Sequence, residues 1–355
     1  MDFKKELSTL KSEIDHEIEI YLDGAIKEAE KTDAFVTAIF KYFKKTILSG
    51  GKRIRPIMMY WGYVGAGGND RQEIIRASIS IELIHAFLLM HDDIIDRDDL
   101  RRGKKTIHAK YRDFHKRFMI GDDSEHFGTS VGIISGDLIY SLGNQVLFSS
   151  QFEPRLIISA LNKMQDIVGL TCVGEMQDIY MEYSDNVKEK DILKMYENKT
   201  ARYTFDGPLK LGAMLAGAGD ELCDELTRFA IPLGIAFQIH DDILGVFGNE
   251  RKTGKPVGSD IAEGKKTVLV SRAYKKATEV QRRVLDELLG KKDISRSDVK
   301  RFQNVLVESG AKKEVELYVE SLLTEARGVL AQLKLKNNAV DFLEELILYL
   351  SNRKN

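Results

Sequence analysis

The chain has 355 residues, 43% of them hydrophobic, and its 53 basic side chains nearly balance 55 acidic ones, for a net charge of −2. This length can bury a large core, either as one big domain or as two smaller ones. The balanced charge gives no electrostatic reason to expect nucleic acid as a partner, so any surface that binds a polyanion must be local.

The cysteines and the N-terminal segment bear on the cellular compartment. Cys172 and Cys223 have no metal-ligand spacing, which favours a reduced, cytoplasmic setting. The N-terminal segment MDFKKELSTLKSEIDHEIE lacks the apolar run of a signal peptide. No stretch of the sequence approaches the roughly 20 apolar residues of a membrane span. We therefore expect a soluble protein of the cytoplasm with no membrane span.

Helical periodicity dominates the chain. Apolar residues recur at spacings of three and four, as in the segment from Ile74 to Leu89, whereas the alternation typical of strands is nearly absent. The pattern predicts an all-α fold, with residues 1–355 as one domain. Besides the segment around Ile74, the predicted helices span residues 3–29, 33–48, 56–66, 126–150, 153–184, 188–216, 220–247, 266–289, 297–309, 311–334 and 338–351.

Prolines and one polar segment mark boundaries within this pattern. Pro56 and Pro154 suit helix starts, whereas Pro208 and Pro232 fall inside helical patterns and should kink them. Residues 110–127, KYRDFHKRFMIGDDSEHF, form a polar connection that we interpret as a surface insertion.

A strongly acidic segment, HDDIIDRDD at residues 91–99, follows the apolar run ISIELIHAFLLM. Two carboxylates about 4 Å apart repel by roughly 4 kcal/mol at an effective dielectric of about 20, so something must offset the repulsion. On a helix, Asp92 and Asp96 share a face, and Asp93 lies about 100° away. This arrangement suits Mg2+, which takes one or two carboxylates together with phosphate oxygens and water. The alternative is a solvated, acidic helix end.

A second acidic pair, Asp241 and Asp242, also follows an apolar run, in IPLGIAFQIHDDILG. This repetition favours metal binding over a solvated helix end. If the two pairs face each other across an apolar space, several Mg2+ ions that bridge a diphosphate would stabilise both.

Basic residues occur near both acidic pairs. The segment SGGKRIRP places Lys52, Arg53 and Arg55 on a glycine-containing turn, and Arg101 and Arg102 directly follow the first acidic segment. The turn is not a P-loop, because it lacks the GxxxxGK[ST] spacing. Each of these cations alone could be ordinary surface charge, but together with the acidic pairs they indicate diphosphate binding. Further candidates of the same kind are Lys199, Lys255, Lys265 and Lys266.

These motifs, taken in chain order, resemble the trans-type isoprenyl diphosphate synthases of the polyprenyl synthetase family. The resemblance covers about residues 50 to 270 and rests on GGKRIRP, DDIIDRDDLRRG, GD at 136–137, KT at 199–200, FQIHDD, GKPVGSD and EGKKT. A lone DDxxD is a weak signal, but this ordered set is specific. It implies a helical bundle of the isoprenoid-synthase kind around a central apolar cavity, and a homodimer.

The resemblance also implies the reaction and the roles of the site residues. Members of the family join an allylic diphosphate to isopentenyl diphosphate, and Mg2+ (three ions in each site) neutralises the leaving diphosphate. By similarity, the metal ligands are Asp92, Asp96 and Asp241, which with Lys199 make up the catalytic group. The allylic diphosphate would contact Lys199, Thr200, Gln238, Lys255, Arg101 and Lys265. Isopentenyl diphosphate would lie on Lys52, Arg55, His85 and Arg102.

Two positions depart from the family pattern. The second acidic motif usually ends in Asp, but position 245 is Gly. The resemblance places the metal contact on Asp241, so we still expect activity. Many relatives carry Gln where Glu175 stands in GEMQD.

Product length depends on the residues just before the first motif, where bulky side chains form the floor of the product tunnel in this family. Phe87 and Leu88 precede Asp92. An ideal helix puts Leu88 about 40° from Asp92 and Phe87 about 140° away, so geometry favours Leu88, whereas the family pattern favours Phe87. An aromatic residue there resembles archaeal-type geranylgeranyl diphosphate synthases. We therefore predict geranylgeranyl diphosphate as the main product, with farnesyl and longer-chain diphosphates as alternatives, and simple core packing as the other interpretation of Phe87.

Two other classes of protein share part of this pattern. A class I terpene cyclase carries a (N/D)Dxx(S/T)xxxE second motif, which DDILGVFGN does not match at the hydroxyl or the final carboxylate. A non-catalytic subunit of a prenyl synthase should have lost metal ligands, yet both acidic pairs are present.

Overall fold

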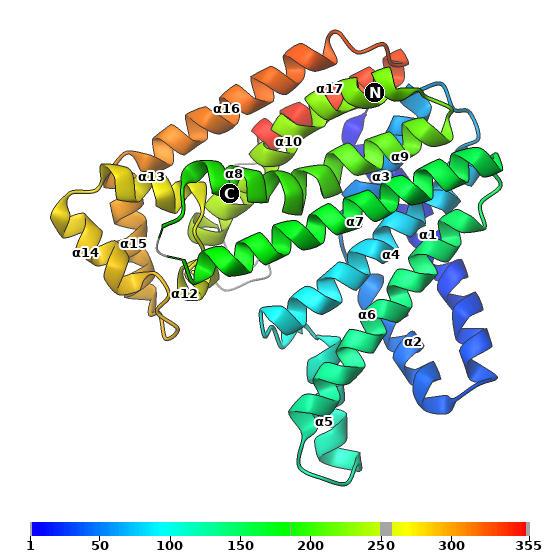
Figure 1. Cartoon of the computed structure of the whole chain (residues 1–355), viewed down its shortest axis with the longest axis horizontal. Coiled ribbons are helices and arrows are strands. Elements are labelled where there is room, and N and C mark those ends of the chain that lie inside the picture. The colour runs from blue at the N-terminus through cyan, green and yellow to red at the C-terminus, as the bar shows by residue number, and fades with distance from the viewer. Residues whose placement is uncertain (1, 185, 249–257, 353–355) are drawn as a thin grey trace.

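The structure is a computed structural model that describes residues 2–184, 186–248 and 258–352. Helices make up almost all of its regular structure, as the sequence predicts. Figure 1 shows the long helices α4, α6 and α7 crossing the middle of the molecule, with α5 projecting from one end of the bundle. The elements are α1 (Phe3–Glu30), α2 (Ala34–Ile47), α3 (Ile54–Gly65), α4 (Arg71–Ile95), β1 (Leu100–Arg101), β2 (Lys104–Lys105), α5 (Ile107–Phe118), α6 (Ser124–Phe148), α7 (Pro154–Glu182), α8 (Glu189–Tyr196), the π-helix η1 (Glu197–Asp206), α9 (Gly207–Leu215), α10 (Asp220–Phe247), α12 (Ser259–Glu263), α13 (Val268–Lys276), α14 (Glu279–Leu288), α15 (Arg296–Glu308), α16 (Ala311–Leu330) and α17 (Asn337–Ser351).

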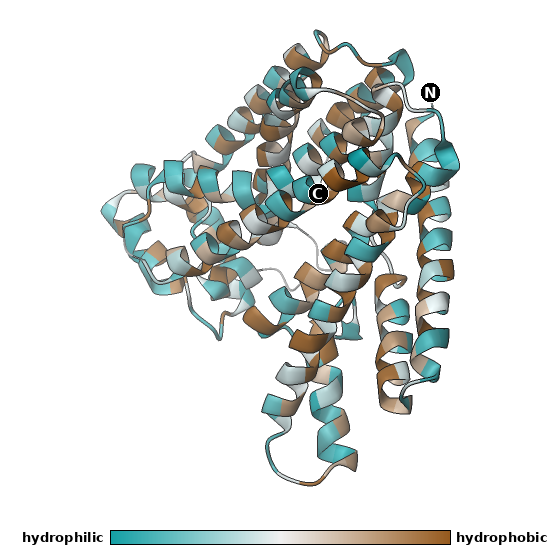
Figure 2. Cartoon of the chain, turned by 45° about the vertical axis from the view of Figure 1, so that its right-hand side comes forward, coloured by the Kyte–Doolittle hydropathy of each residue, from teal (hydrophilic) through white to brown (hydrophobic). Residues whose placement is uncertain are grey.

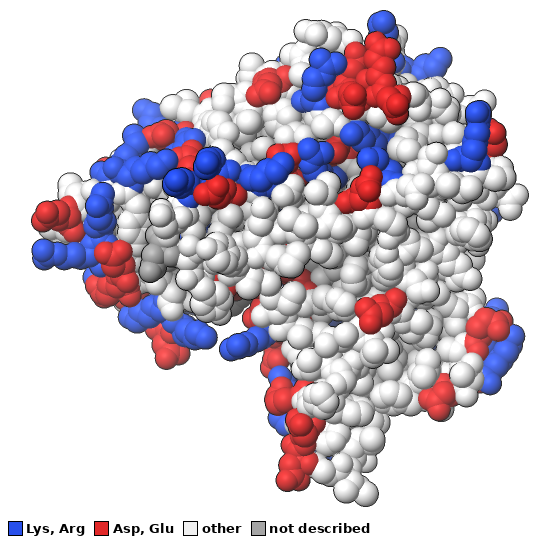
Figure 3. Space-filling view, viewed as in Figure 1, with Lys and Arg blue, Asp and Glu red and all other residues white. Residues whose placement is uncertain are grey.

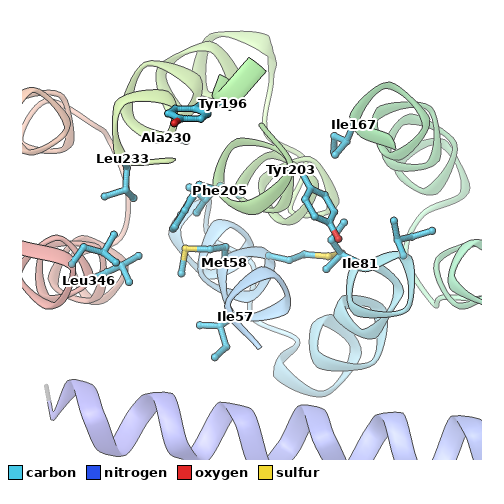
Figure 4. Packing of buried hydrophobic residues seen from close by; sticks show 14 of the residues in the cluster. Ile57, Met58, Ile81, Ile167, Tyr196, Tyr203, Phe205, Ala230, Leu233 and Leu346 are labelled. Carbon is cyan, nitrogen blue, oxygen red and sulfur yellow. The ribbon is translucent and has the colours of Figure 1, made fainter. Parts of the chain in front are cut away.

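The helices pack around a shared hydrophobic core that extends from Phe3 to Leu350. Most helices carry both hydrophobic and hydrophilic residues (Figure 2), and the hydrophobic faces turn inward. Figure 4 shows this packing at close range, where Met58 of α3, Phe205 of η1 and Leu233 of α10 lie in one layer of buried side chains. The core thereby fixes α4, η1 and α10, the three helices that carry most of the predicted site residues.

The segment predicted as a polar surface insertion is largely helical. Residues 107–118 form α5, and α6 begins at Ser124, so residues 119–123 alone connect the two helices. Ile107, Tyr111 and His115 are buried on one face of α5 at a spacing of four. The helix itself was not predicted, because the other positions of the segment are polar and mask this narrow apolar face.

Two other predicted helices are divided in the structure. The predicted helix 188–216 is a continuous helical run, but its middle ten residues form η1. The predicted helix 266–289 ends at Lys276, and Thr278 caps α14 with a side-chain bond to the N–H of Gln281. Pro208 lies inside the first of these runs, as the sequence indicates, at the second position of α9 where the π-helix η1 gives way to an α-helix. Pro232 lies inside α10, as the sequence indicates.

Three helices, α4, α7 and α10, are long and apolar enough to cross a membrane when only length and composition are considered. The expectation that no segment approaches a membrane span therefore does not hold by this criterion. The most apolar windows of α4 and α10 are 67% and 56% buried inside the fold, whereas that of α7 is 33% buried. Much of α7 is therefore an uncovered apolar helix at the surface.

Candidate active site

The first acidic motif ends α4. Asp92 and Asp96 lie on the last turn and are half-buried, and the backbone N–H of Asp96 donates to the carbonyl of Asp92 at 2.8 Å. Asp93 is buried, and burial raises the pKa of its carboxyl to about 7 although Arg101 opposes the shift. The helical wheel predicted this division, with Asp92 and Asp96 on one face and Asp93 on another.

A hairpin of two short strands, β1 and β2, follows the acidic motif and brings Arg101 onto it. The Arg101 guanidinium bonds to Asp93, lies 3.3 Å from Asp92 Oδ2 and 3.8 Å from Asp98 Oδ2. The sequence predicts that Mg2+ offsets the repulsion among these carboxylates, but in the structure part of the offset comes from this arginine. Arg101, predicted to contact the allylic diphosphate, is engaged by the carboxylates in this structure.

The glycine turn before α3 lies beside the tip of the hairpin. Arg102 Nη1 donates to the carbonyl of Gly50 at 2.5 Å. Both Lys52 and Arg102 are exposed. Arg53, the third cation predicted on this turn, is buried and is bound by Asp15 and Glu82 at 2.6 Å each. Arg53 therefore holds the turn in place. Lys52 on the turn and Arg102 beside it are exposed to solvent.

His85 lies deeper on α4, next to a stacked tyrosine and arginine. Its Nδ1 is 2.8 Å from the hydroxyl of Tyr203 in η1, and the Arg55 guanidinium lies 4.1 Å from the Tyr203 ring centre. Burial, followed by the charges of Arg55 and Arg102, holds the pKa of His85 well below its ordinary value. His85 is therefore a neutral hydrogen-bonding group. A pocket lined by His85, Arg101 and Arg102 opens beside it.

Tyr203 was not predicted from the sequence. It lies four residues after Lys199 in the segment KTARY, and positions four apart share a helical face, which could have indicated it.

Lys199 of η1 pairs with two carboxylates of α7 and lies near the first acidic motif. Its Nζ is 2.5 Å from Asp178 Oδ2 and 2.8 Å from Glu175 Oε2. Burial alone would lower the pKa of Lys199, but Asp178, Glu175 and then Asp92 outweigh it and raise that pKa above its ordinary value. The helices can approach this closely because Gly174 has no side chain, and a Cβ there would lie 2.4 Å from Lys199 N.

Asp178 was also not predicted, although Glu175 and Asp178 stand three apart in GEMQD and therefore share a helical face.

The second acidic motif, on α10, is tied to η1 by a chain of hydrogen bonds. Thr200 Oγ1 donates to Gln238 Oε1 at 2.6 Å, and Gln238 Nε2 donates to Asp242 Oδ1 at 2.9 Å. Asp242 also accepts from the Tyr196 hydroxyl, and burial raises the pKa of its carboxyl to about 8. Asp242 is thus a structural acid that orients Gln238, whereas Asp241 is half-buried on the neighbouring face.

Lys265, just after α12, lies near Asp96 of the first acidic motif. Its Nζ is 3.1 Å from Glu263 Oε2. Burial would lower the pKa of Lys265, but Asp96, Glu263 and further carboxylates raise it above its ordinary value. Figure 3 shows acidic and basic side chains on both sides of the hollow between the end of α4 and the region of α12. Lys255, the remaining predicted contact of the allylic diphosphate, lies outside the described residues.

The carboxylates fit Mg2+ that arrives together with a diphosphate. Among residues 2–184, 186–248 and 258–352, no group of three or more His, Cys, Asp or Glu side chains is close enough to hold an ion by itself. Mg2+ commonly takes one or two carboxylates and completes its shell with phosphate oxygens and water. Asp92, Asp96 and Asp241 are carboxylates of this kind, beside cations suited to phosphate.

The two candidate chain-length residues differ in their neighbours. The Phe87 ring centre is 5.1 Å from that of Tyr140 on α6 and 4.9 Å from that of His91. Leu88, like Phe87, is half-buried against the hydrophobic core. Phe87 therefore fills the interface between α4 and α6.

Comparisons with known proteins agree with the motifs. The family model for polyprenyl synthetase matches residues 36–306. The geranylgeranyl diphosphate synthase of Saccharolobus solfataricus is 32% identical over 301 residues, covering 81% of this chain and 85% of that protein. The geranylfarnesyl diphosphate synthase of Aeropyrum pernix is 33% identical over 313 residues, covering 85% and 92%. A crystal structure of geranylgeranyl pyrophosphate synthase from Corynebacterium glutamicum, complexed with isoprenyl diphosphate and magnesium, has a TM-score of 0.92 at 31% identity and covers 98% of this chain and 99% of that one.

Proposed function

The chain belongs to the polyprenyl synthetase family, and from this premise we propose that it is a Mg2+-dependent trans-prenyltransferase that joins isopentenyl diphosphate to allylic diphosphates. We propose geranylgeranyl diphosphate as its main product. The observation that carries the proposal is that two lysines from separate elements lie near the first acidic motif at the end of α4. Lys199 of η1 is within the electrostatic reach of Asp92, and Lys265, just after α12, is within that of Asp96.

The residues divide between two substrates. We propose that Asp92, Asp96 and Asp241 hold Mg2+ with the allylic diphosphate, and that the exposed Lys52 and Arg102 bind isopentenyl diphosphate. When bound, Mg2+ supplies the charge neutralisation that lets the diphosphate leave. Three ions per site is the number we propose by similarity. The other proposed contacts of the allylic diphosphate are Lys199, Thr200, Gln238, Lys255, Arg101 and Lys265, and those of isopentenyl diphosphate are Arg55 and His85.

An assay of the purified protein with isopentenyl diphosphate, Mg2+ and each of dimethylallyl, geranyl and farnesyl diphosphate tests the function. We expect elongation of all three primers and none without a divalent ion. A cyclic hydrocarbon product would identify a terpene cyclase instead, and inactivity with every primer would favour a non-catalytic subunit. The similarity to the geranylfarnesyl diphosphate synthase of Aeropyrum pernix makes a longer product the second candidate.

His85 should bind isopentenyl diphosphate as a neutral imidazole that donates a hydrogen bond. Since its pKa lies well below the ordinary value, the imidazole is neutral near pH 7. We expect His85→Gln to keep most of the affinity, because glutamine also donates a neutral hydrogen bond. His85→Ala should raise the KM for isopentenyl diphosphate about tenfold to a hundredfold, as for loss of one bond to a charged group.

Steady-state kinetics at several pH values check this prediction. The KM for isopentenyl diphosphate in the wild type should show no histidine titration step near neutral pH. A step near the ordinary pKa of histidine, or a loss in His85→Gln as large as in His85→Ala, would contradict it.

We also propose that the protein is a homodimer, with a partner covering the apolar face of α6 and α7. Figure 3 shows a broad expanse with few charged side chains across these helices. Leu170, Val173, Met176, Tyr180 and Tyr183 form one exposed stripe on and just after α7. The exposed large hydrophobic residues of α6 are Ile133, Ile134 and Phe148.

Light scattering at micromolar concentration should report twice the mass of one chain. The double variant Ile134→Glu with Met176→Glu places two charges on the proposed interface, where the wild-type side chains are 66% and 61% exposed, and should give monomers. Ile20→Glu is the matched control, because Ile20 is also exposed (52%) but lies on α1. A monomeric wild-type protein, or a double variant as dimeric as the control, would contradict the assignment.

One continuous hydrophobic core supports the proposal that the chain is a single domain. The free thiols of Cys172 and Cys223 support a cytoplasmic location.

A further inference from the structure

Glu175 of α7 is a charged residue at a position where many relatives carry a neutral glutamine. Its Oε2 lies 2.8 Å from Lys199 Nζ, and Asp178 Oδ2 lies 2.5 Å from the same nitrogen. A glutamine at position 175 could accept the same hydrogen bond through its side-chain oxygen. What Glu175 adds to the site is therefore a negative charge and not an additional contact.

The two carboxylates limit what Lys199 can offer to a ligand. A lysine ammonium group has three N–H donors, and Glu175 and Asp178 take two of them, so at most one is left for a diphosphate oxygen. One positive and two negative charges give this group of three side chains a net charge of −1. Lys199 is therefore a poor binding group for a diphosphate that carries no metal.

The negative charge of this group lies beside the first acidic motif. Glu175, Asp178 and Glu182 stand at spacings of three and four and share one face of α7. Burial is the largest cause that raises the pKa of Glu175 and of Glu182, and the further causes include Asp92 for Glu175 and Asp96 for Glu182. This face of α7 therefore lies near both carboxylates that we propose as metal ligands on α4.

A fixed negative charge at Glu175 acts with opposite sign on the two components of the ligand. It repels the diphosphate anion and attracts Mg2+. Because Glu175 is half-buried, salt and water screen these interactions less than they would at an exposed position. A diphosphate without metal is therefore disfavoured beside Lys199, whereas Mg2+ on Asp92 is favoured.

We propose that Glu175 makes binding of the allylic diphosphate depend on Mg2+, so that the site discriminates against a diphosphate that arrives without metal. This inference rests on the proposed function. Glu175 is a positioning residue that acts through Lys199 and through its charge, and Glu175→Gln should loosen the link between the two ligands.

Calorimetry with inorganic diphosphate tests this role, with the Kd measured once in the presence of a metal chelator and once at saturating Mg2+. The ratio of the two values reports the coupling between Mg2+ and diphosphate. Glu175→Gln should tighten metal-free binding and lower this ratio about tenfold, whereas Glu175→Asp, which keeps the charge, should retain most of it. Diphosphate also binds Mg2+ in solution, but that contribution is the same for every variant and cancels in the comparison.

A control on the same helix accompanies these variants. Asp166→Asn removes one charge from α7 at a side chain that is 65% exposed, and it should bind like the wild type under both conditions. Circular dichroism should show native helix in each variant.

The outcomes separate the inference from the proposed function. If Glu175→Gln weakens metal-free binding or keeps the wild-type ratio, Glu175 only holds Lys199 in place and the inference is wrong, while the proposed function stands. A ratio in Glu175→Asp as low as that in Glu175→Gln would also contradict a role of the charge. If the wild type itself shows no Mg2+-dependent binding of diphosphate, both the proposed function and the inference fall.

Discussion

Replacement of Asp92 or Asp96 by Asn should reduce turnover by orders of magnitude while the fold remains native. These two carboxylates share a face at the end of α4, and an amide is a much poorer ligand for Mg2+ than a carboxylate. Turnover should fall at saturating substrate, because the missing interaction acts as the diphosphate leaves and develops charge. Rates with geranyl diphosphate and isopentenyl diphosphate, measured over a wide range of Mg2+ concentrations, check this prediction.

The folded state should tolerate both changes. Asp92 lies 3.3 Å from Arg101, but Arg101 keeps its bond to the buried Asp93, so removal of one half-exposed partner should change the unfolding free energy by about 1 kcal/mol or less. Without Mg2+, the melting temperature should therefore hold or rise slightly as repulsion within the cluster falls.

Asp98→Asn is the matched control for these variants. It removes one charge from the same cluster without touching the shared face of Asp92 and Asp96. Similar turnover losses in all three variants, or wild-type turnover in both Asp92→Asn and Asp96→Asn, would refute the assignment of the metal ligands.

The separate roles within each Asp-Asp pair show what the sequence can predict. On α4, helical geometry alone separates Asp92 from Asp93, and the structure places Asp93 in the interior with Arg101. On α10, the same geometry separates Asp241 from Asp242, but no sequence pattern indicates that the Tyr196 hydroxyl binds Asp242. That contact joins residues 46 positions apart and depends on how the helices pack.

The hairpin that carries Arg101 could not be found by periodicity. Each strand has two residues, which is too short for an alternating pattern. Its turn contains Arg102 and Gly103, both with positive φ, and tight hairpin turns of this kind favour glycine. The Arg102-Gly103 dipeptide is therefore a weak local signal for a turn. Because the sequence does not predict the hairpin, Mg2+ is the only partner that it indicates for the repelling carboxylates.

The π-helix η1 also could not be predicted from the sequence. Apolar spacing predicted a helix over residues 188–216, and the run is helical throughout. The widened turns of η1 change the direction of each side chain relative to an α-helix, and they carry Lys199, Thr200 and Tyr203. Sequence reasoning could therefore name Lys199 and Thr200 but could not place them against α7 and α10.

Phe87→Ala should lengthen the product beyond geranylgeranyl diphosphate. The ring of Phe87 fills the space between α4 and Tyr140 of α6, so its removal opens space there without touching any proposed diphosphate contact. The chain should then grow until it meets Tyr140, whose hydroxyl is bonded to Gln165 of α7. Turnover with short primers should fall little, because the geometry at the reacting carbon is unchanged. Chromatography of the dephosphorylated products measures the shift.

A purely structural Phe87 predicts a different result. Truncation of a buried aromatic residue costs about 3–5 kcal/mol, and half-burial should bring Phe87→Ala to the lower end of that range. Product length would then stay the same while the melting temperature falls. Leu88→Ala is the variant to compare, because an ideal helix places Leu88 closer than Phe87 to the face of Asp92. If Leu88→Ala lengthens the product and Phe87→Ala does not, helical geometry identifies the tunnel floor correctly and the family pattern does not. The contact between Phe87 and Tyr140 then serves only to pack α4 against α6.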